Sequence, residues 1–169
     1  MEKKEVKVKD SRMYSLIVLF DMHTDFFGKA IEGISDKDSQ NRLNTKAVHP
    51  AWIAGSITQE RFELANNLLD KDDKQAAYEL FENHKGIQDT VKYPSLSEFK
   101  KDWDKVSPAL REALSNATTE KLDTSFEMMP GAKMTYYELY SFMMYREANM
   151  IGQLALWRRL LGYEGIKYM

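Results

Sequence analysis

The segment TYYELYSFMMYREANMIGQLALWRRLLG, residues 135–162, is the longest uninterrupted stretch of helical apolar periodicity in this chain. Thr135 followed three residues later by Glu138 is the pattern of a capping box, which begins a helix. Gly162 is typical of a helix end, and the two arginines just before it complement the negative end of a helix dipole. The sequence therefore predicts one long helix over this segment.

Apolar residues occur on more than one side of this predicted helix. The main set has the three- and four-residue spacing of one helix face, and it comprises Leu139, Phe142, Met143, Met150, Leu154, Trp157 and Leu161. A second set follows a neighbouring face, and it comprises Tyr140, Met144, Ala148, Ile151 and Ala155. A helix of this kind is normally buried by several neighbours. A mid-helix glycine costs about 1 kcal/mol relative to alanine, so we expect Gly152 to permit a close approach between helices.

Three further amphipathic helices are expected. The first begins at Asp10 or Ser11 and ends before Gly33, the second covers residues 50–69, and the third covers residues 95–114. Pro50 suits the first position of a helix, and Ser95 with Glu98 forms a second capping box, whereas Pro108 predicts a kink.

Between these helices we expect a short helix over residues 75–83 and a helical turn near residues 119–122. No segment shows a useful length of strand alternation. The sequence therefore predicts an all-α fold, an antiparallel four-helix bundle with a short extra helix, although the long links permit a crossover. We expect a single domain over residues 1–169, with residues 1–10 as a charged tail.

The composition excludes several classes of function. The chain has 169 residues, of which 43% are hydrophobic and 30% charged, and its formal net charge is -2. It has no cysteine, which excludes disulfides, thiolate metal sites and a cysteine nucleophile. A near-neutral charge gives no reason to expect nucleic acid or a membrane surface as a partner. With no signal peptide and no membrane-spanning run, we expect a cytoplasmic protein.

Common catalytic motifs do not occur in this sequence. It has no glycine-rich phosphate loop, no GxSxG, no HExxH and no ExxH pair. Its three histidines, His23, His49 and His84, lack a framing serine or aspartate nearby. A lone histidine at the edge of an apolar stripe is more often structural than catalytic, and we interpret His23 in that way.

Several polar residues lie on otherwise apolar helix faces. Ser56 and Glu60 share the inward face of the second long helix, and Arg146 and Gln153 share that of the last. An unpaired guanidinium is too costly to leave at a core-facing position. The sequence therefore predicts an ion pair between Arg146 and Glu60 across the bundle, with Ser56 nearby, unless Glu60 points out to solvent.

Two segments together resemble the DinB/YfiT-like superfamily. They are AWIAGSITQERF, residues 51–62, and YREANMIGQLALWRRLLG, residues 145–162. The second resembles that family's final helix, in which two histidines precede an apolar-Gly-Gln step, an apolar run and Arg-Leu-Leu-Gly. The resemblance implies a four-helix bundle, often a homodimer, with a divalent metal such as zinc or nickel held by three histidines. Some members of the family are thiol-dependent transferases.

The family's metal-ligand positions carry different residues in this chain. The resemblance places Ser56, Arg146 and Met150 at the three histidine positions. Serine is a poor ligand for such a metal, methionine is a soft and weak one, and arginine carries a permanent positive charge. We therefore expect no metal or other cofactor at this site, with Glu60 and Gln153 as further residues of the same pocket.

Two functions of different classes remain open at the level of sequence. In the first, the chain is a non-metal member that binds a small ligand, such as an anion, through Arg146, or acts as a dimeric module. Its dimer surface would then be the side of the last helix that carries Tyr136, Tyr137 and Tyr140.

In the second, the chain is a metal- or thiol-dependent transferase whose ligands have moved, with His23, His49, Glu60 and Glu147 as candidates. Whether the chain is an enzyme stays open. A nucleic-acid binder is the least favoured interpretation, because the sequence has no basic stripe.

Overall fold

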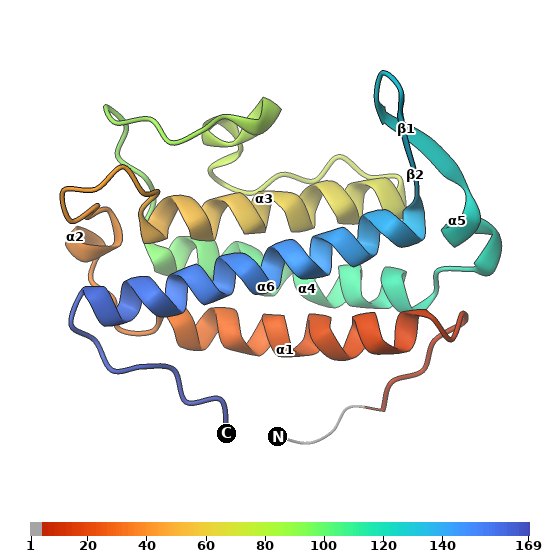
Figure 1. The fold of residues 1–169 in the computed structure, drawn as a ribbon, viewed down its shortest axis with the longest axis horizontal. Helices are drawn as coiled ribbons and strands as arrows, with labels where there is room; N and C mark the ends of the chain where they lie inside the picture. Colours follow the sequence, from red (N-terminus) through yellow and green to blue (C-terminus); the bar gives the residue numbers. More distant parts are fainter. Residues whose placement is uncertain (1–4) are drawn as a thin grey trace.

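The computed structural model describes residues 5–169, and these are mostly helical (Figure 1). The long helices are α1 (Met13–Ile31), α3 (Pro50–Leu69), α4 (Leu96–Ser115) and α6 (Tyr136–Leu160). The shorter elements are α2 (Asp36–Ser39), the 3₁₀ turns η1 (Tyr78–Leu80) and η2 (Glu82–His84), α5 (Thr119–Asp123), β1 (Ser125–Met129) and β2 (Ala132–Thr135).

The long helices pack side by side, and each has two neighbours. Helix α1 contacts α4 and α6, and α3 contacts the same two helices. In Figure 1, α1 and α6 run in one direction, whereas α3 and α4 run in the opposite direction. Residues 70–95 return along the length of the molecule to join α3 to α4. The helices therefore do not alternate in direction along the chain, so the predicted antiparallel order is wrong for α3 and α4.

The core consists of two apolar clusters at opposite ends of the long helices. The first cluster joins the end of α1 to the beginnings of α3 and α4 and the end of α6, and includes Phe27, Ile53, Phe99, Met150 and Leu154. The second cluster joins the opposite ends of the same helices, and includes Ile17, Phe62, Leu110 and Met144. The region between the two clusters holds buried polar side chains, described below.

The helix starts follow the local sequence. Both predicted capping boxes are present, Ser95 with Glu98 and Thr135 with Glu138. Helix α3 begins instead with His49, whose Nδ1 accepts a hydrogen bond of 3.1 Å from the backbone N–H of Trp52. Burial lowers the pKa of His49 to about 4, so this ring is neutral and able to accept that bond at neutral pH.

Residues 125–135, predicted as a connector, form an antiparallel hairpin. Phe126 pairs with Met134 and Glu127 with Lys133, with an irregularity before Met129. The strands are mostly exposed, so neither face has to be apolar and no clear alternation appears in the sequence. The turn contains Gly131, which has a positive φ of 82°.

One other prediction of local structure, the short helix over residues 75–83, needs correction. Residues 75–83 form 3₁₀ turns in place of one short helix, and the left-handed φ of 56° at Asn83 prevents a continuous helix there. Helix α4 is continuous through Pro108, and Ser107 Oγ donates to the backbone oxygen of Trp103 beside it.

The prediction that Gly152 permits a close approach between two helices is wrong for the helices of this chain. A Cβ added at Gly152 would meet no atom within 4 Å, so no helix of the same chain approaches it. The glycine that permits close packing is Gly55 on α3, where an added Cβ would lie 2.1 Å from Phe81 and 2.8 Å from Phe99.

The tyrosine side of α6, predicted as a dimer surface, is covered by the chain itself. Tyr140 is fully buried, and Tyr136 and Tyr137 are half-buried against the second cluster. The ring of Tyr136 packs on Phe126 of the hairpin at a centroid distance of 4.9 Å.

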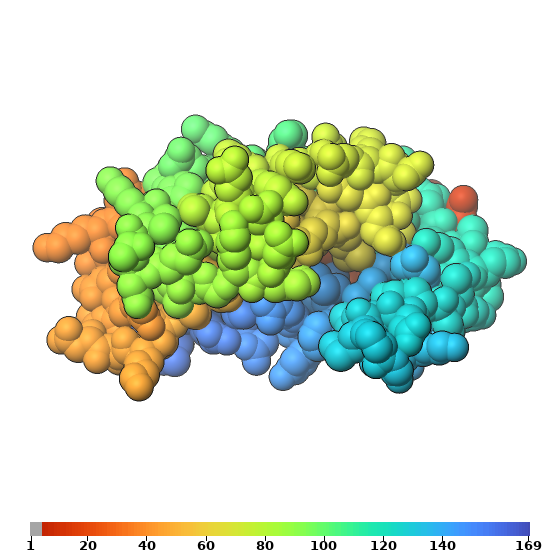
Figure 2. Space-filling model, turned by 90° about the horizontal axis from the view of Figure 1, so that it is seen from above, coloured from red at the N-terminus to blue at the C-terminus, as the bar shows by residue number. Residues whose placement is uncertain are grey.

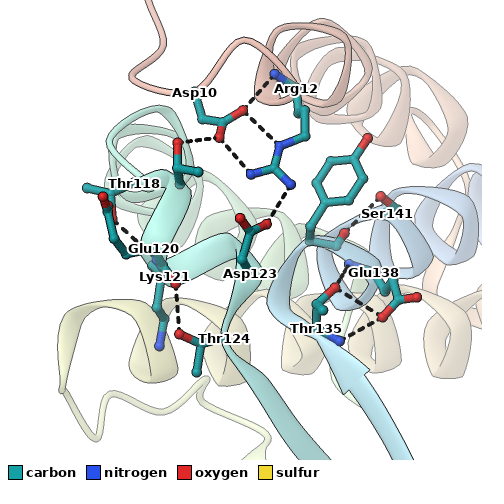
Figure 3. Close-up of polar contacts among 12 residues, drawn as sticks. Asp10, Arg12, Thr118, Glu120, Lys121, Asp123, Thr124, Thr135, Glu138 and Ser141 are labelled. Carbon is teal, nitrogen blue, oxygen red and sulfur yellow. Dashed lines mark hydrogen bonds and ion pairs between the residues drawn. The ribbon is translucent and has the colours of Figure 1, made fainter.

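The segment before α1 packs on the second apolar cluster, so residues 5–10 are not a solvated tail. Residues 1–4 lie outside the described residues. Val6 and Val8 contact the second cluster. Arg12 donates from Nη2 to Asp10 Oδ2 at 2.8 Å and from Nη1 to Asp123 Oδ1 at 2.7 Å (Figure 3). Hydrogen bonds from Arg12 and Thr119 hold the pKa of Asp10 well below its usual range.

Candidate functional site

A buried ion pair lies between the two apolar clusters. Arg61 of α3 donates from Nε to Glu147 Oε1 at 2.6 Å and from Nη2 to Glu147 Oε2 at 2.9 Å. Arg61 is fully buried and Glu147 is 1% exposed. The guanidinium carbon lies 3.4 Å from the ring centroid of Trp103 and 4.0 Å from that of Phe20. The bidentate geometry and the two rings together hold this charge inside the protein.

Three further polar side chains complete this layer. Arg61 Nη1 donates to Thr24 Oγ1 at 2.9 Å and to Ser107 Oγ at 2.6 Å, and His23 Nδ1 lies 3.1 Å from Glu147 Oε2. His23 is therefore a buried, hydrogen-bonded residue, as predicted. Burial alone would raise the pKa of Glu147, but the charge of Arg61 and the hydrogen bonds outweigh it, so this pKa is lowered.

Arg61 was not predicted from the sequence as a buried residue, although its spacing on α3 indicates one. Arg61 lies four residues after Ile57 and three before Leu64, which is the spacing of the buried α3 face. Glu147 likewise falls three residues after Met144 and four before Ile151 on α6. A basic and an acidic residue at core spacing on two helices predict such a pair.

A second polar group lies nearer the surface between α3 and α6. Arg146 donates from Nε to Glu60 Oε1, so the ion pair predicted from the sequence is confirmed. The pair is less buried than its neighbour, with side-chain exposures of 33% for Arg146 and 16% for Glu60. Glu60 therefore does not point out into solvent.

The Glu60–Arg146 pair borders a cavity of about 70 Å³. Its lining residues come from α3, from α6 and from the segment between α3 and α4, and are Trp52, Ser56, Gln59, Glu60, Glu63, Phe81, His84, Lys85 and Arg146. The segment over residues 70–95, in yellow-green and green in Figure 2, lies over the long helices on the side that faces the viewer there. We call this space the Arg146 cavity.

The structure brings together three of the five residues predicted for this site. Ser56, Glu60 and Arg146 all line the Arg146 cavity. Met150 is not among the lining residues and is buried in the first apolar cluster. Gln153 is also absent from the lining, and its Nε2 donates to Asn149 Oδ1 on the same helix at 2.7 Å.

Two residues that line the Arg146 cavity each have a buried side-chain atom without a hydrogen-bond partner among the described residues. These atoms are the acceptor Glu60 Oε2 and the donor Trp52 Nε1. Burial raises the pKa of Glu60 to about 7, although the hydrogen bond and charge of Arg146 oppose this rise. Glu60 therefore changes its charge near neutral pH, next to a permanent cation.

The residues of the Arg146 cavity do not fit a divalent metal. The guanidinium of Arg146 bonds to Glu60, one of the two carboxylates in the lining, and a guanidinium cannot be a metal ligand. Over residues 5–169, no group of three or more histidine, aspartate or glutamate side chains could hold a metal ion.

The relocated ligands considered from the sequence do not converge either. His23 and Glu147 meet, but both carboxylate oxygens of Glu147 accept hydrogen bonds from Arg61. His49 caps α3, and its ring centroid lies 5.1 Å from that of Tyr93. Glu60 lines the Arg146 cavity. These four side chains therefore form no single site.

Comparison with models of protein families found no match for this chain, and a search of curated proteins found none. In the part of the chain that the structure describes, no helix has the length and apolar character needed to cross a membrane.

Proposed function

We propose that this chain is a non-metal relative of the DinB/YfiT-like four-helix bundles and that it binds a small carboxylate in the Arg146 cavity. The helical arrangement and the positions of Ser56 and Arg146 beside one cavity support this proposal. The observation that carries it is that Trp52, whose buried indole N–H has no partner among the described residues, lines the same cavity as Arg146.

The donors of the cavity suit an anion. Among the described residues, the Arg146 side chain donates a hydrogen bond only from Nε, to Glu60. Its two terminal nitrogens are therefore available to a ligand. The indole N–H of Trp52 and the hydroxyl of Ser56 supply two more donors. Carboxylates are bound well by such a set, because charge-assisted hydrogen bonds from arginine are strong and directional.

The size of the cavity limits the ligand. A water molecule takes about 30 Å³ of liquid volume, so 70 Å³ holds roughly the carboxylate end of a molecule. The rest of a larger ligand would extend toward His84 and Lys85 at the border of the cavity.

Protonation of Glu60 is expected to control binding. While Glu60 is ionised, it neutralises Arg146 and repels an anion; once protonated, it can donate a hydrogen bond to the ligand. Because the pKa of Glu60 is raised to about 7, an anion should bind more tightly as the pH falls through this value. From pH 8 to pH 6 the expected gain in affinity is about tenfold.

Titration with sodium acetate, followed by the Trp52 indole N–H signal in NMR spectra, tests this function. We expect a saturable shift that strengthens between about pH 8 and pH 6, with sodium chloride at equal ionic strength as the reference. Arg146→Met should abolish the shift, whereas Arg159→Met, an exposed arginine on the same helix, should preserve it. A shift that does not saturate, or that survives Arg146→Met, would contradict the proposal.

The transferase alternative has less support, because His23 and Glu147 are already engaged with each other and with Arg61. The proposal is therefore one of ligand binding and includes no catalytic step. It retains the cytoplasmic location expected from the sequence.

A further inference from the structure

Buried hydrogen bonds attach the chain on both sides of the segment that covers the Arg146 cavity. Before this segment, Gln75 donates from Nε2 to the backbone oxygen of Gly55 at 3.1 Å. After it, the backbone N–H of Tyr93 donates to Gln40 Oε1 at 2.8 Å, and Gln40 Nε2 donates back to the Tyr93 oxygen at 3.2 Å. We call residues 78–92, which lie between these two attachments, the strap.

Apolar packing, and not hydrogen bonding, holds the strap on the long helices. Within residues 5–169, its hydrogen bonds join residues close to it in the chain, apart from a surface ion pair of Asp89 with Arg42. Surface ion pairs contribute little. The main contact is Phe81, which is 4% exposed and whose ring occupies the space beside Gly55.

The closed strap leaves buried polar groups without partners. Among the described residues, seven side-chain polar atoms are buried with no hydrogen-bond partner, and four of them belong to the strap, to its first attachment or to residues that line the Arg146 cavity. These four are Gln88 Nε2, Gln75 Oε1, Trp52 Nε1 and Glu60 Oε2. Each such group costs free energy that hydration would recover. Opening of the strap would therefore be partly offset by water reaching these atoms.

The backbone of the strap and the space beside it also favour movement. Asn83 and His84 both have a left-handed φ of 56°, which is costly for residues other than glycine and is relieved when the segment is released. A groove of about 1080 Å³ is lined by Tyr78 and Leu80 of the strap and by Glu98 of α4. This part of the strap is therefore not packed against α4.

We propose that the strap is a lid, which opens to admit the ligand to the Arg146 cavity and closes over it. Phe81, His84 and Lys85 of the strap line this cavity, which holds only about 70 Å³ in the closed position. Trp52 Nε1 is buried there, so a ligand does not reach this donor unless the strap moves. The ligand is that of the proposed function, on which this inference rests, whereas the movement of the strap can be measured without any ligand.

Thiol labelling of Ser56→Cys with iodoacetamide tests the movement. The chain has no other cysteine, and Ser56 lines the cavity and is 8% exposed, so the reagent reaches this position when the strap opens. We expect labelling at least about tenfold slower than that of Ser15→Cys, an exposed position on α1, and at least about tenfold faster than global unfolding. Labelling as fast as that of Ser15→Cys, or as slow as global unfolding, would overturn the lid.

Two matched substitutions in the Ser56→Cys chain separate local opening from unfolding. Phe81→Leu weakens the contact of the strap, and Phe62→Leu removes a similar volume from the second apolar cluster, where Phe62 is 2% exposed. Phe81→Leu should speed labelling by about fivefold or more, and Phe62→Leu should leave the rate within about twofold, because local opening depends on local contacts. Equal acceleration by the two substitutions would overturn the lid.

Titration with acetate of the chain that retains Ser56 tests the ligand separately. A strap that opens in a chain without saturable acetate binding would contradict the proposed function and support the lid. Saturable acetate binding in a chain whose strap does not open would overturn the lid and support the proposed function.

Discussion

Arg61 is the residue on which the interior of this protein most depends. It is fully buried, and its guanidinium bonds to Glu147, Thr24 and Ser107 between two aromatic rings. Replacing one partner of such a pair leaves an uncompensated charge in the core. Replacing both with apolar side chains of similar volume is often neutral.

Arg61→Met should therefore lower the free energy of unfolding by about 3–5 kcal/mol, measured by urea denaturation. The double variant Arg61→Met with Glu147→Leu should recover much of this loss, because it removes both buried charges. If Arg61→Met costs less than about 1 kcal/mol, the pair does not have the role described for it.

Glu60 gives the protein a pH-dependent stability of predictable sign. Its pKa is raised to about 7 in the folded protein, above the value of about 4.5 for an exposed glutamate, so the folded state favours the protonated form. This contribution is complete below about pH 4.5 and is lost as the pH rises through 7, by at most about 3–4 kcal/mol.

Glu60→Gln, which cannot ionise, should flatten the fall in stability between pH 5 and pH 8, as measured by urea denaturation at several pH values. Glu63→Gln, at the border of the same cavity, is the matched control and should keep the wild-type slope. An unchanged slope in Glu60→Gln would show that this carboxyl does not titrate near neutral pH.

At the scale of elements, the helix starts and stops could be read from the sequence, and the hairpin could not. Capping residues act within one turn, so Ser95 and Thr135 mark helix starts without reference to the rest of the fold. The hairpin over residues 125–135 has little buried surface, and its cross-strand hydrogen bonds leave no apolar pattern in the sequence.

The two glycines within long helices allow a direct comparison. Gly152→Ala should stabilise the chain by about 0.5–1 kcal/mol at concentrations where it is monomeric, because alanine is the better helix former and meets no neighbour. Gly55→Ala should destabilise it, because the added methyl would overlap the ring of Phe81. Thermal unfolding of both variants checks this, and effects of the same sign would contradict the packing described for Gly55.

At the scale of the whole molecule, pairings between distant residues were only partly predictable. The Glu60–Arg146 pair could be predicted, because both residues interrupt apolar faces of their helices. The direction of α4 relative to α3 could not, because residues 70–95 are long enough to reach either end of the bundle. The contacts of Glu147 with Arg61 and His23 could not be predicted either, because they depend on how the long helices are arranged.

If Ser56 and Arg146 stand at metal-ligand positions of the DinB/YfiT-like family, as proposed, the whole protein should purify with far less than one divalent metal per chain. Arginine and serine cannot replace histidine in a zinc or nickel site, and Arg146 is bonded to Glu60. Elemental mass spectrometry measures the content, and thermal shifts with zinc, nickel and manganese provide the comparison. Stoichiometric metal would mean that other residues hold it.

The most direct test of the account is an NMR titration of the Glu60 side-chain carboxyl carbon, with and without saturating acetate. We predict a pKa near 7 in the free protein and a higher pKa with acetate, because an anion beside Arg146 favours the protonated carboxyl. A pKa near 4.5 that acetate leaves unchanged would contradict both the burial of Glu60 and the proposed carboxylate site.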